Sequence, residues 1–204
     1  RQRFGYKGFR YVEASIDRPA VLDENNLTAY FVHSDIPTKG HIHTSSEIIN
    51  KLWKASCYSY LSNLVGYPTD CPQREKNGWT GDTNAAMDLG FYNYDPITVY
   101  EKWMDDHKDA QLPNGVYPNI IPSPGWGYDW ANGTDWTSTN IAVPWKTWLF
   151  YGDDHLLRSM YSNMKAYMDY IERTYPEGLT DWGLGDWIPV KSTSSVELTS
   201  SIYY

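Results

Sequence analysis

The spacing of apolar residues changes near residue 40 of this 204-residue chain. Before that point, residues 4–33 carry the pattern of strands. Residues 9–16 partly alternate apolar and polar side chains, and residues 27–32 are β-branched and aromatic. A polar turn at 23–26 separates the two runs. So small a sheet needs a partner face to cover it, and we therefore expect residues 1–38 to be the C-terminal strands of a larger β-sandwich domain.

Two helices are expected in the next part of the chain. The first follows a capping-box sequence at Thr44–Glu47. Its apolar positions recur at helical spacing, and they are Ile48, Leu52, Trp53, Cys57, Tyr60, Leu61 and Leu64. The second helix is expected to cover about residues 81–92.

Three more helices are expected after residue 94. The third takes Asp95 as its N-cap and Pro96 as its first helical residue. The fourth ends at Gly152, and the fifth begins at Asp153 or Asp154. Their apolar positions are Tyr100, Trp103 and Met104 in the third, Ile141, Trp145, Trp148 and Leu149 in the fourth, and Leu156, Leu157, Met160, Met164, Tyr167, Met168 and Ile171 in the fifth. At this spacing the methionines and tyrosines are predicted to be core.

The connection between the third and fourth helices, Leu112 to Trp136, is long and rich in Pro, Gly and aromatic residues. Unstructured connections of this length are uncommon in compact domains and are often functional. Antiparallel helices joined by alternately short and long loops suit an α/α-toroid whose long loops gather at one mouth. Five helices cannot close such a ring, so we expect the mainly α chain to be a fragment.

Charge argues against two classes of partner. The formal net charge is −8 and there is no run of basic residues, which disfavours nucleic acid and an anionic membrane surface. No stretch approaches the roughly 20 apolar residues of a membrane span, and we expect no signal peptide at the start of the chain. The sequence does not determine the cellular compartment, although a periplasmic or extracellular location is weakly favoured over the cytoplasm. The oligomeric state is not determined by the sequence.

Cysteine and histidine usage gives no sign of a metal site. Cys57 and Cys71 alone supply neither a disulfide framework nor a ligand quartet. His41, His43 and His107 lack metal-ligand spacing and are expected in surface or core polar roles. We expect no metal and no organic cofactor.

Aromatic residues are in excess, with ten Trp and 18 Tyr. Aromatic faces stack on the C–H faces of sugar rings, and their polar edges can hydrogen-bond to hydroxyl groups. The excess therefore favours a carbohydrate ligand. Filling the space between large helices is the alternative for any single Trp.

The segment Asp70–Asp82 holds the densest group of reactive side chains. Its carboxylates are Asp70, Glu75 and Asp82, and the cations Arg74 and Lys76 lie among them. Crowded carboxylates raise each other's proton affinity, and a desolvating aromatic wall does the same, so that one of them can act as a general acid. Adjacent cations act in the opposite direction, so charge alone does not identify the acid. The alternative is a structural loop in which Asp70 caps a backbone amide and Asp82 caps the second helix.

The same segment, DCPQREKNGWTGD, resembles the signature of the bacterial α-L-rhamnosidases of glycoside hydrolase family 78. Residues 3–12 look like the family's last β-domain before the catalytic domain. Further matching stretches are Val32–Asp35, Tyr92–Asp95, Lys102-Trp103 with Asp106, Ala110-Gln111, Pro144-Trp145 and Gly185-Asp186-Trp187.

This resemblance implies that residues 39–204 are the N-terminal part of an (α/α)6 barrel of the six-hairpin glycosidase type. It also implies an inverting hydrolase that removes terminal α-L-rhamnose from glycosides. Glu75 lies where the family places its general acid. Asp70 and Asp82 match the carboxylates that bind rhamnose hydroxyl groups and shape the surroundings of the acid. The implied partner is a rhamnosylated carbohydrate or glycoside.

Further pocket residues follow from the same resemblance. Arg74 and Trp79 match pocket positions, and Trp187 matches an aromatic wall of the sugar subsite. Trp136 matches another wall, within a stretch that only loosely resembles the family pattern. At Lys76-Asn77 the family more commonly has a basic residue followed by Leu. This difference affects the detailed shape of the loop more than its chemistry.

An inverting mechanism also needs a base across the sugar ring, ~6.5–9.5 Å from the acid. In the family this base follows the Gly-Asp-Trp element, together with a pocket His, and neither Glu177 nor Glu197 lies in such a context. We therefore expect the chain to hold the acid and much of the pocket but no base, and to be inactive alone. Two alternatives stay open, a toroid glycosidase of other sugar specificity and a non-catalytic sugar-binding homologue.

Overall fold

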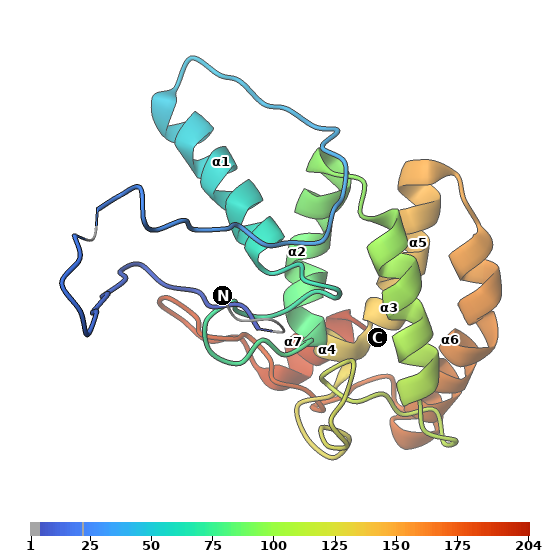
Figure 1. Cartoon of the computed structure of the whole chain (residues 1–204). Coiled ribbons are helices and arrows are strands. Elements are labelled where there is room, and N and C mark those ends of the chain that lie inside the picture. The colour runs from blue at the N-terminus through green and yellow to red at the C-terminus, as the bar shows by residue number, and fades with distance from the viewer. Residues whose placement is uncertain (1–4, 22) are drawn as a thin grey trace.

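In the computed structural model, which describes residues 5–21 and 23–204, the regular elements are helices (Figure 1). They are α1 (Glu47–Ser62), α2 (Thr80–Asn93), α3 (Ile97–Ala110), α4 (Thr134–Thr137), α5 (Thr139–Tyr151), α6 (His155–Thr174) and α7 (Val196–Ile202). The five predicted helices are therefore confirmed as α1, α2, α3, α5 and α6. The short helices α4 and α7 were not predicted, because neither is long enough to show a helical repeat.

The prediction of strands in residues 4–33 is wrong for the described part of that range, which leaves out Phe4 and Leu22. The predicted turn is present, since the Asn26 amide donates to the Asp23 carbonyl oxygen at 3.1 Å. The flanking backbone is extended but forms no ladder there, and its apolar side chains are exposed. The physical reason is that a strand needs a neighbour to pair its N–H and C=O groups. The β-sandwich origin of residues 1–38 stays a prediction, and residues 3 and 4 of the matching 3–12 stretch lie outside the described chain.

Helix α1 begins differently from the prediction. Its N-cap is Ser46, which makes no side-chain capping bond, so the predicted capping box does not form. Instead the Asn50 side chain binds both backbone groups of Thr44. The Thr44 amide donates to Asn50 Oδ1 at 2.8 Å, and Asn50 Nδ2 donates to the Thr44 carbonyl oxygen at 2.9 Å. The Thr44 hydroxyl accepts from the Ser46 amide at 3.2 Å, so Asn50 and this hydroxyl together hold the turn that leads into α1.

The start of α3 also differs by one residue. Pro96 is the N-cap and Ile97 the first helical residue, whereas Asp95 lies outside the helix. There Asp95 forms an ion pair of 2.7 Å with Lys39, and this bond lowers the pKa of the Asp95 carboxyl. The Asp95 amide donates to the Pro37 carbonyl oxygen at 2.8 Å. These contacts hold the chain before α1 against the α2–α3 turn.

The largest core lies among α2, α3, α5 and α6, and α5 and α6 pack side by side (Figure 1). The predicted core residues Tyr100, Trp103 and Met104 are fully buried in it. The fourth predicted helix, α5, ends as expected at Gly152, whose φ of 69° is left-handed. A second, smaller cluster joins α1 to α2 and α3, and the two clusters position the loops between helices.

Several helices expose apolar side chains on faces turned away from the core. These residues are Ile48, Ile49 and Leu52 on α1, Trp145, Trp148 and Leu149 on α5, and Leu198 and Ile202 on α7. Contiguous apolar surface of this kind is typical of a face that another element covers. None of the helices in residues 5–21 and 23–204 combines the length and apolar character that crossing a membrane requires.

Candidate active site

The Asp70–Asp82 segment forms the connection that leads into α2, as a loop closed on itself. Asp70 pairs with Asn77: the Asn77 amide donates to Asp70 Oδ1 at 2.9 Å, and the Asp70 amide donates to the Asn77 carbonyl oxygen at 3.0 Å. The amide of Glu75 donates to Cys71 Sγ at 3.3 Å. Lys76 has a left-handed φ of 57°, which turns the chain between these contacts. Asp70 thus caps a backbone amide, as the structural alternative expects, and in doing so it shapes the loop around Glu75.

Glu75 lies on the exposed side of this loop with its carboxylate oriented by Trp79. The indole Nε1 of Trp79 donates to Glu75 Oε2 at 2.8 Å. Trp79 is half-buried and is the N-cap residue of α2. A solvent-accessible carboxylate with one oxygen held by a fixed donor can reach a leaving group outside the protein surface.

The carboxyl group of Asp82 is affected by its surroundings and by the two other carboxylates of the loop. Burial raises the pKa of Asp82 to about 6, and the negative charges of Asp70 and, to a smaller extent, Glu75 act in the same direction. By its solvent-accessible area Asp82 is exposed, so the desolvation comes from protein groups packed around only part of the side chain. The protein nevertheless surrounds it closely enough to disfavour the charged form. The sequence alone did not identify Asp82 as a carboxyl group with a raised pKa.

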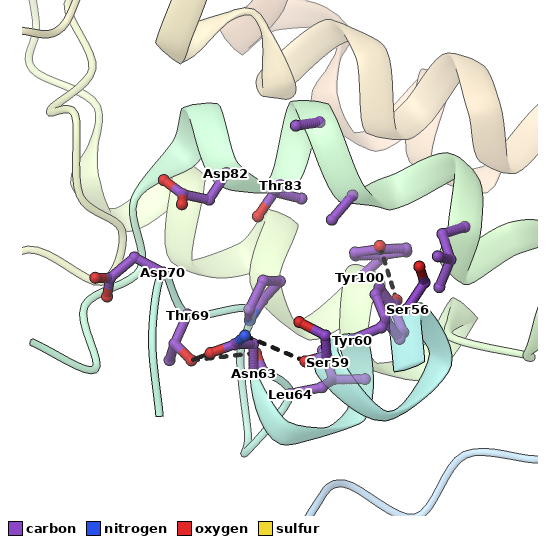
Figure 2. A pocket seen from close by; sticks show the side chains of 14 residues that line it. Ser56, Ser59, Tyr60, Asn63, Leu64, Thr69, Asp70, Asp82, Thr83 and Tyr100 are labelled. Carbon is purple, nitrogen blue, oxygen red and sulfur yellow. Dashed lines mark hydrogen bonds between the residues drawn. The ribbon is translucent and has the colours of Figure 1, made fainter. Parts of the chain in front are cut away.

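Asp70 and Asp82 are among the residues that line a hollow of about 330 Å³ between α1 and α2. Figure 2 shows both carboxylates at one end of it, with the Tyr60–Tyr100 hydroxyl pair, 2.9 Å apart, further in. Glu75 and Trp79 are not among the residues that line this hollow. The two predicted sugar-binding carboxylates therefore lie together, and Glu75 lies at the outer side of the loop.

The predicted aromatic walls, Trp136 and Trp187, contact each other edge to face, with ring centroids 6.2 Å apart. Trp136, in α4, is 9% exposed and packs directly on Gly81 of α2, where a Cβ would overlap its ring. Trp187 is 62% exposed. The loosely matched Trp136 is thus brought beside Asp82, and Trp187 extends from it into solvent.

Asp135 is a contributor that the sequence did not single out. Its side chain is 5% exposed, and its Oδ2 accepts a hydrogen bond of 2.6 Å from the amide of Gly185, fifty residues further along the chain. Burial raises the pKa of this carboxyl, and backbone donors at Gly185 and Leu184 oppose that rise. Through Gly185, Asp135 holds the segment that carries Trp187.

Arg74 is a predicted pocket residue that makes no polar contact with the other predicted site residues, all of which are described. Its side chain is exposed and makes no hydrogen bond or ion pair with the described residues. In the same part of the chain, residues 5–21 and 23–204, no three His, Cys, Asp or Glu side chains converge as metal ligands would.

The long connection before α4 is bonded through residues 119–121 to the Asp70–Asp82 segment, which we call the acid loop after the role predicted for Glu75. The Ile121 amide donates to the Gly78 carbonyl oxygen at 2.8 Å, and the Thr80 amide donates to the Asn119 carbonyl oxygen at 3.0 Å. Gly78 is required at this crossing, because a Cβ there would overlap the backbone of Ile121. The two loops therefore form one hydrogen-bonded unit around Trp79.

Comparison with known proteins gives a consistent match. Residues 37–204 match the family model described as the bacterial alpha-L-rhamnosidase 6 hairpin glycosidase domain. The chain is 32% identical over 92% of its length to an alpha-L-rhamnosidase of Formosa agariphila, and 30% identical over 99% to one of Streptomyces avermitilis. It covers 20% of each of these proteins and so spans about a fifth of the length of the relatives it matches.

Solved structures agree with this match. The structure of alpha-L-rhamnosidase from Dictyoglumus thermophilum is similar with a TM-score of 0.79 at 32% identity, over 84% of this chain and 20% of that one. The structure of the Streptomyces avermitilis alpha-L-rhamnosidase complexed with L-rhamnose is similar with a TM-score of 0.78 at 28% identity, over 84% of this chain and 17% of that one. The helical arrangement described above is therefore one that these enzymes also contain.

Proposed function

The chain belongs to the six-hairpin glycosidase domain family of bacterial alpha-L-rhamnosidases, and from this premise we propose that it forms part of an inverting hydrolase that removes terminal α-L-rhamnose. The observation that carries the proposal is the acid loop. It gathers three carboxylates and Trp79 beside the Trp136–Trp187 pair. The structure of a relative in complex with L-rhamnose supports the choice of sugar.

In the proposed reaction Glu75 donates a proton to the glycosidic oxygen as the bond to the sugar breaks. Its hydrogen bond to Trp79 holds the carboxyl group in one orientation, which reduces the entropy lost when the substrate binds. A base on the opposite face of the ring must activate water, and we propose that it comes from a part of the protein outside this chain. The 204-residue chain by itself is then expected to be inactive.

Asp70 and Asp82 would bind rhamnose hydroxyl groups from the end of the hollow between α1 and α2. With its pKa raised to about 6, Asp82 is partly protonated in mildly acidic solution and can then donate as well as accept a hydrogen bond. Trp136 and Trp187 would supply the stacking surface, with Asp135 holding Trp187 in place through Gly185.

Asp82 is a second candidate for the general acid. A general acid works best when its pKa lies near the working pH, and the pKa of Asp82 is raised to about 6. Glu75 is preferred because its place in the sequence motif matches that of the family's general acid, whereas Asp82 lies in the first turn of α2 and lines the hollow.

Hydrolysis of 4-nitrophenyl glycosides by the complete protein that carries this chain tests the proposal. We expect the α-L-rhamnoside to be cleaved, and proton NMR at early times to show β-L-rhamnose as the first product, since inversion changes the anomer. Cleavage of another glycoside with no action on the rhamnoside would point to a toroid glycosidase of other specificity. Rhamnose binding without any turnover would point to a non-catalytic homologue. Either result contradicts the proposal.

A further inference from the structure

Two tryptophans of the long connection form an exposed aromatic pair. The rings of Trp126 and Trp130 are stacked with an interplanar angle of 2° and centroids 5.9 Å apart. Trp126 is 40% exposed and Trp130 is 53% exposed, although Trp is among the most expensive side chains to leave in water. We call this pair the tryptophan platform. No role in the rhamnose pocket described above uses it.

The loop that carries the platform is held from beneath by buried polar side chains. Asn119 and Asn132 have no solvent exposure. Asn119 Nδ2 donates to the carbonyl oxygen of Trp130 at 2.9 Å, and Asn132 Nδ2 donates to that of Tyr128 at 2.9 Å. The Tyr128 hydroxyl in turn donates to the Ala110 carbonyl oxygen at the end of α3, at 2.8 Å. Hydrogen bonds from buried side-chain amides to a loop's carbonyl oxygens favour one loop conformation, so the exposure of the two rings is built into the fold.

The platform is placed next to the general acid through Trp79. The ring of Trp79 meets both platform rings edge to face, at centroid distances of 6.3 Å to Trp126 and 6.0 Å to Trp130. The same indole donates through Nε1 to Glu75. Asn119, which binds the carbonyl oxygen of Trp130 through its side chain, also accepts from the Thr80 amide through its own carbonyl oxygen. Moving the platform relative to Glu75 would therefore break the hydrogen bonds that Asn119 makes with Trp130 and Thr80, or the one that Trp79 makes with Glu75.

The platform and the rhamnose walls are separate groups of rings. Among the described residues, Trp126 and Trp130 contact each other and Trp79, whereas Trp136 contacts Trp187. A general acid lies between the sugar that is released and the group that leaves with the glycosidic oxygen. An aromatic surface that is separated from the acid only by Trp79 and is distinct from the sugar walls fits the leaving-group side.

We propose that the tryptophan platform is the subsite for the leaving group, and that it selects leaving groups with a flat ring face. This inference rests on the proposed function. Asp129 is the one charged residue in the sequence from 123 to 130, so recognition relies on stacking more than on charge. Both an aromatic ring and the C–H face of a pyranose offer the required surface.

Three α-L-rhamnosides that differ in their leaving group test the subsite in the complete protein. The first carries methanol, the second a fused-ring phenol and the third a glucose residue. Trp126→Ala and Trp130→Ala are each expected to lower kcat/KM for the two ring-bearing substrates by roughly 3- to 10-fold and to leave methyl rhamnoside unchanged. Trp126→Phe and Trp130→Phe keep a ring and are expected to recover part of the loss. Tyr161→Ala, which removes an exposed aromatic residue of α6, is the control and is expected to change none of the three.

The pattern of losses decides the outcome. A larger loss for the phenol identifies an aromatic leaving group, and a larger loss for the glucoside identifies a sugar; both support the subsite. Equal losses on all three substrates, methyl rhamnoside included, would show that the two tryptophans only stabilise the loop. Unchanged kinetics would also overturn the subsite. If the unmodified protein cleaves no rhamnoside at all, the proposed function is refuted first and the subsite with it.

Discussion

The indole Nε1 of Trp79 lies 2.8 Å from Oε2 of Glu75 and donates a hydrogen bond to it. Trp79→Phe keeps an aromatic ring for Trp126 and Trp130 to pack on but removes this donor. Because the bond orients an exposed carboxylate and solvent competes for it, we expect kcat for an unactivated rhamnoside to fall by roughly 5- to 10-fold. Steady-state kinetics of the complete protein measure this. Trp148→Phe on α5 is the matched control, and a Trp79→Phe rate equal to that of the control would contradict an orienting role.

The bond between Asp135 Oδ2 and the Gly185 amide, at 2.6 Å, leads to a second prediction. Asp135→Ala leaves that buried amide without its acceptor, so the segment bearing Trp187 loses its anchor. We expect KM for rhamnosides to rise by roughly 5-fold or more while kcat changes less, because the role proposed for Trp187 is to stack on the sugar and not to transfer a proton. Asp135→Asn retains an acceptor oxygen and should restore part of the affinity. A fall in kcat with KM unchanged would contradict the assignment of Asp135 as a positioning residue.

His107 leads to a prediction about acid stability. It is fully buried, and because the Trp103 carbonyl oxygen 2.8 Å from Nδ1 can only accept, Nδ1 carries the proton of a neutral ring. Burial lowers the pKa of His107 to about 4, below its usual 6.5. Between those values the unfolded chain binds a proton that the folded chain does not. The contribution to stability is therefore present above pH 6.5 and is lost as the pH falls toward 4, by at most about 3 kcal/mol.

Urea unfolding of the complete protein at pH 7 and pH 5 measures this contribution. His107→Gln removes the titrating group but keeps a side chain that can donate to the Trp103 carbonyl oxygen. We expect the variant to be less stable at pH 7 and to lose less stability than the unmodified protein between the two pH values. An equal loss in both proteins would show that His107 does not titrate on unfolding.

The helices could be predicted because each one buries a stripe of residues at 3.6-residue spacing, as Met160, Tyr167 and Ile171 do on α6. The strands could not be predicted correctly, since alternation in residues 9–16 indicates a suitable surface but not the presence of a partner strand. The start of α1 depends on Asn50, a residue inside the helix that binds back to Thr44. Local sequence signals therefore identified the elements better than their ends.

The site was only partly visible in the sequence. Asp70, Glu75, Trp79 and Asp82 fall within thirteen residues, so their proximity follows from the chain itself. Asp135 was missed because its partner Gly185 is fifty residues away. The raised pKa of Asp82 depends on burial, which no local pattern reports. These are long-range properties that require the fold.

The central claim is that Glu75, rather than Asp82, is the general acid. It is tested most directly by comparing Glu75→Gln with Asp82→Asn in the complete protein, on methyl α-L-rhamnoside and on a 2,4-dinitrophenyl α-L-rhamnoside whose leaving group needs no protonation. We predict that Glu75→Gln lowers kcat for the methyl glycoside by roughly 100-fold or more, and has far less effect on the dinitrophenyl glycoside. Asp82→Asn should affect both substrates alike, mainly through KM. A loss confined to the methyl glycoside in Asp82→Asn, with Glu75→Gln close to the unmodified protein on both substrates, would contradict the account.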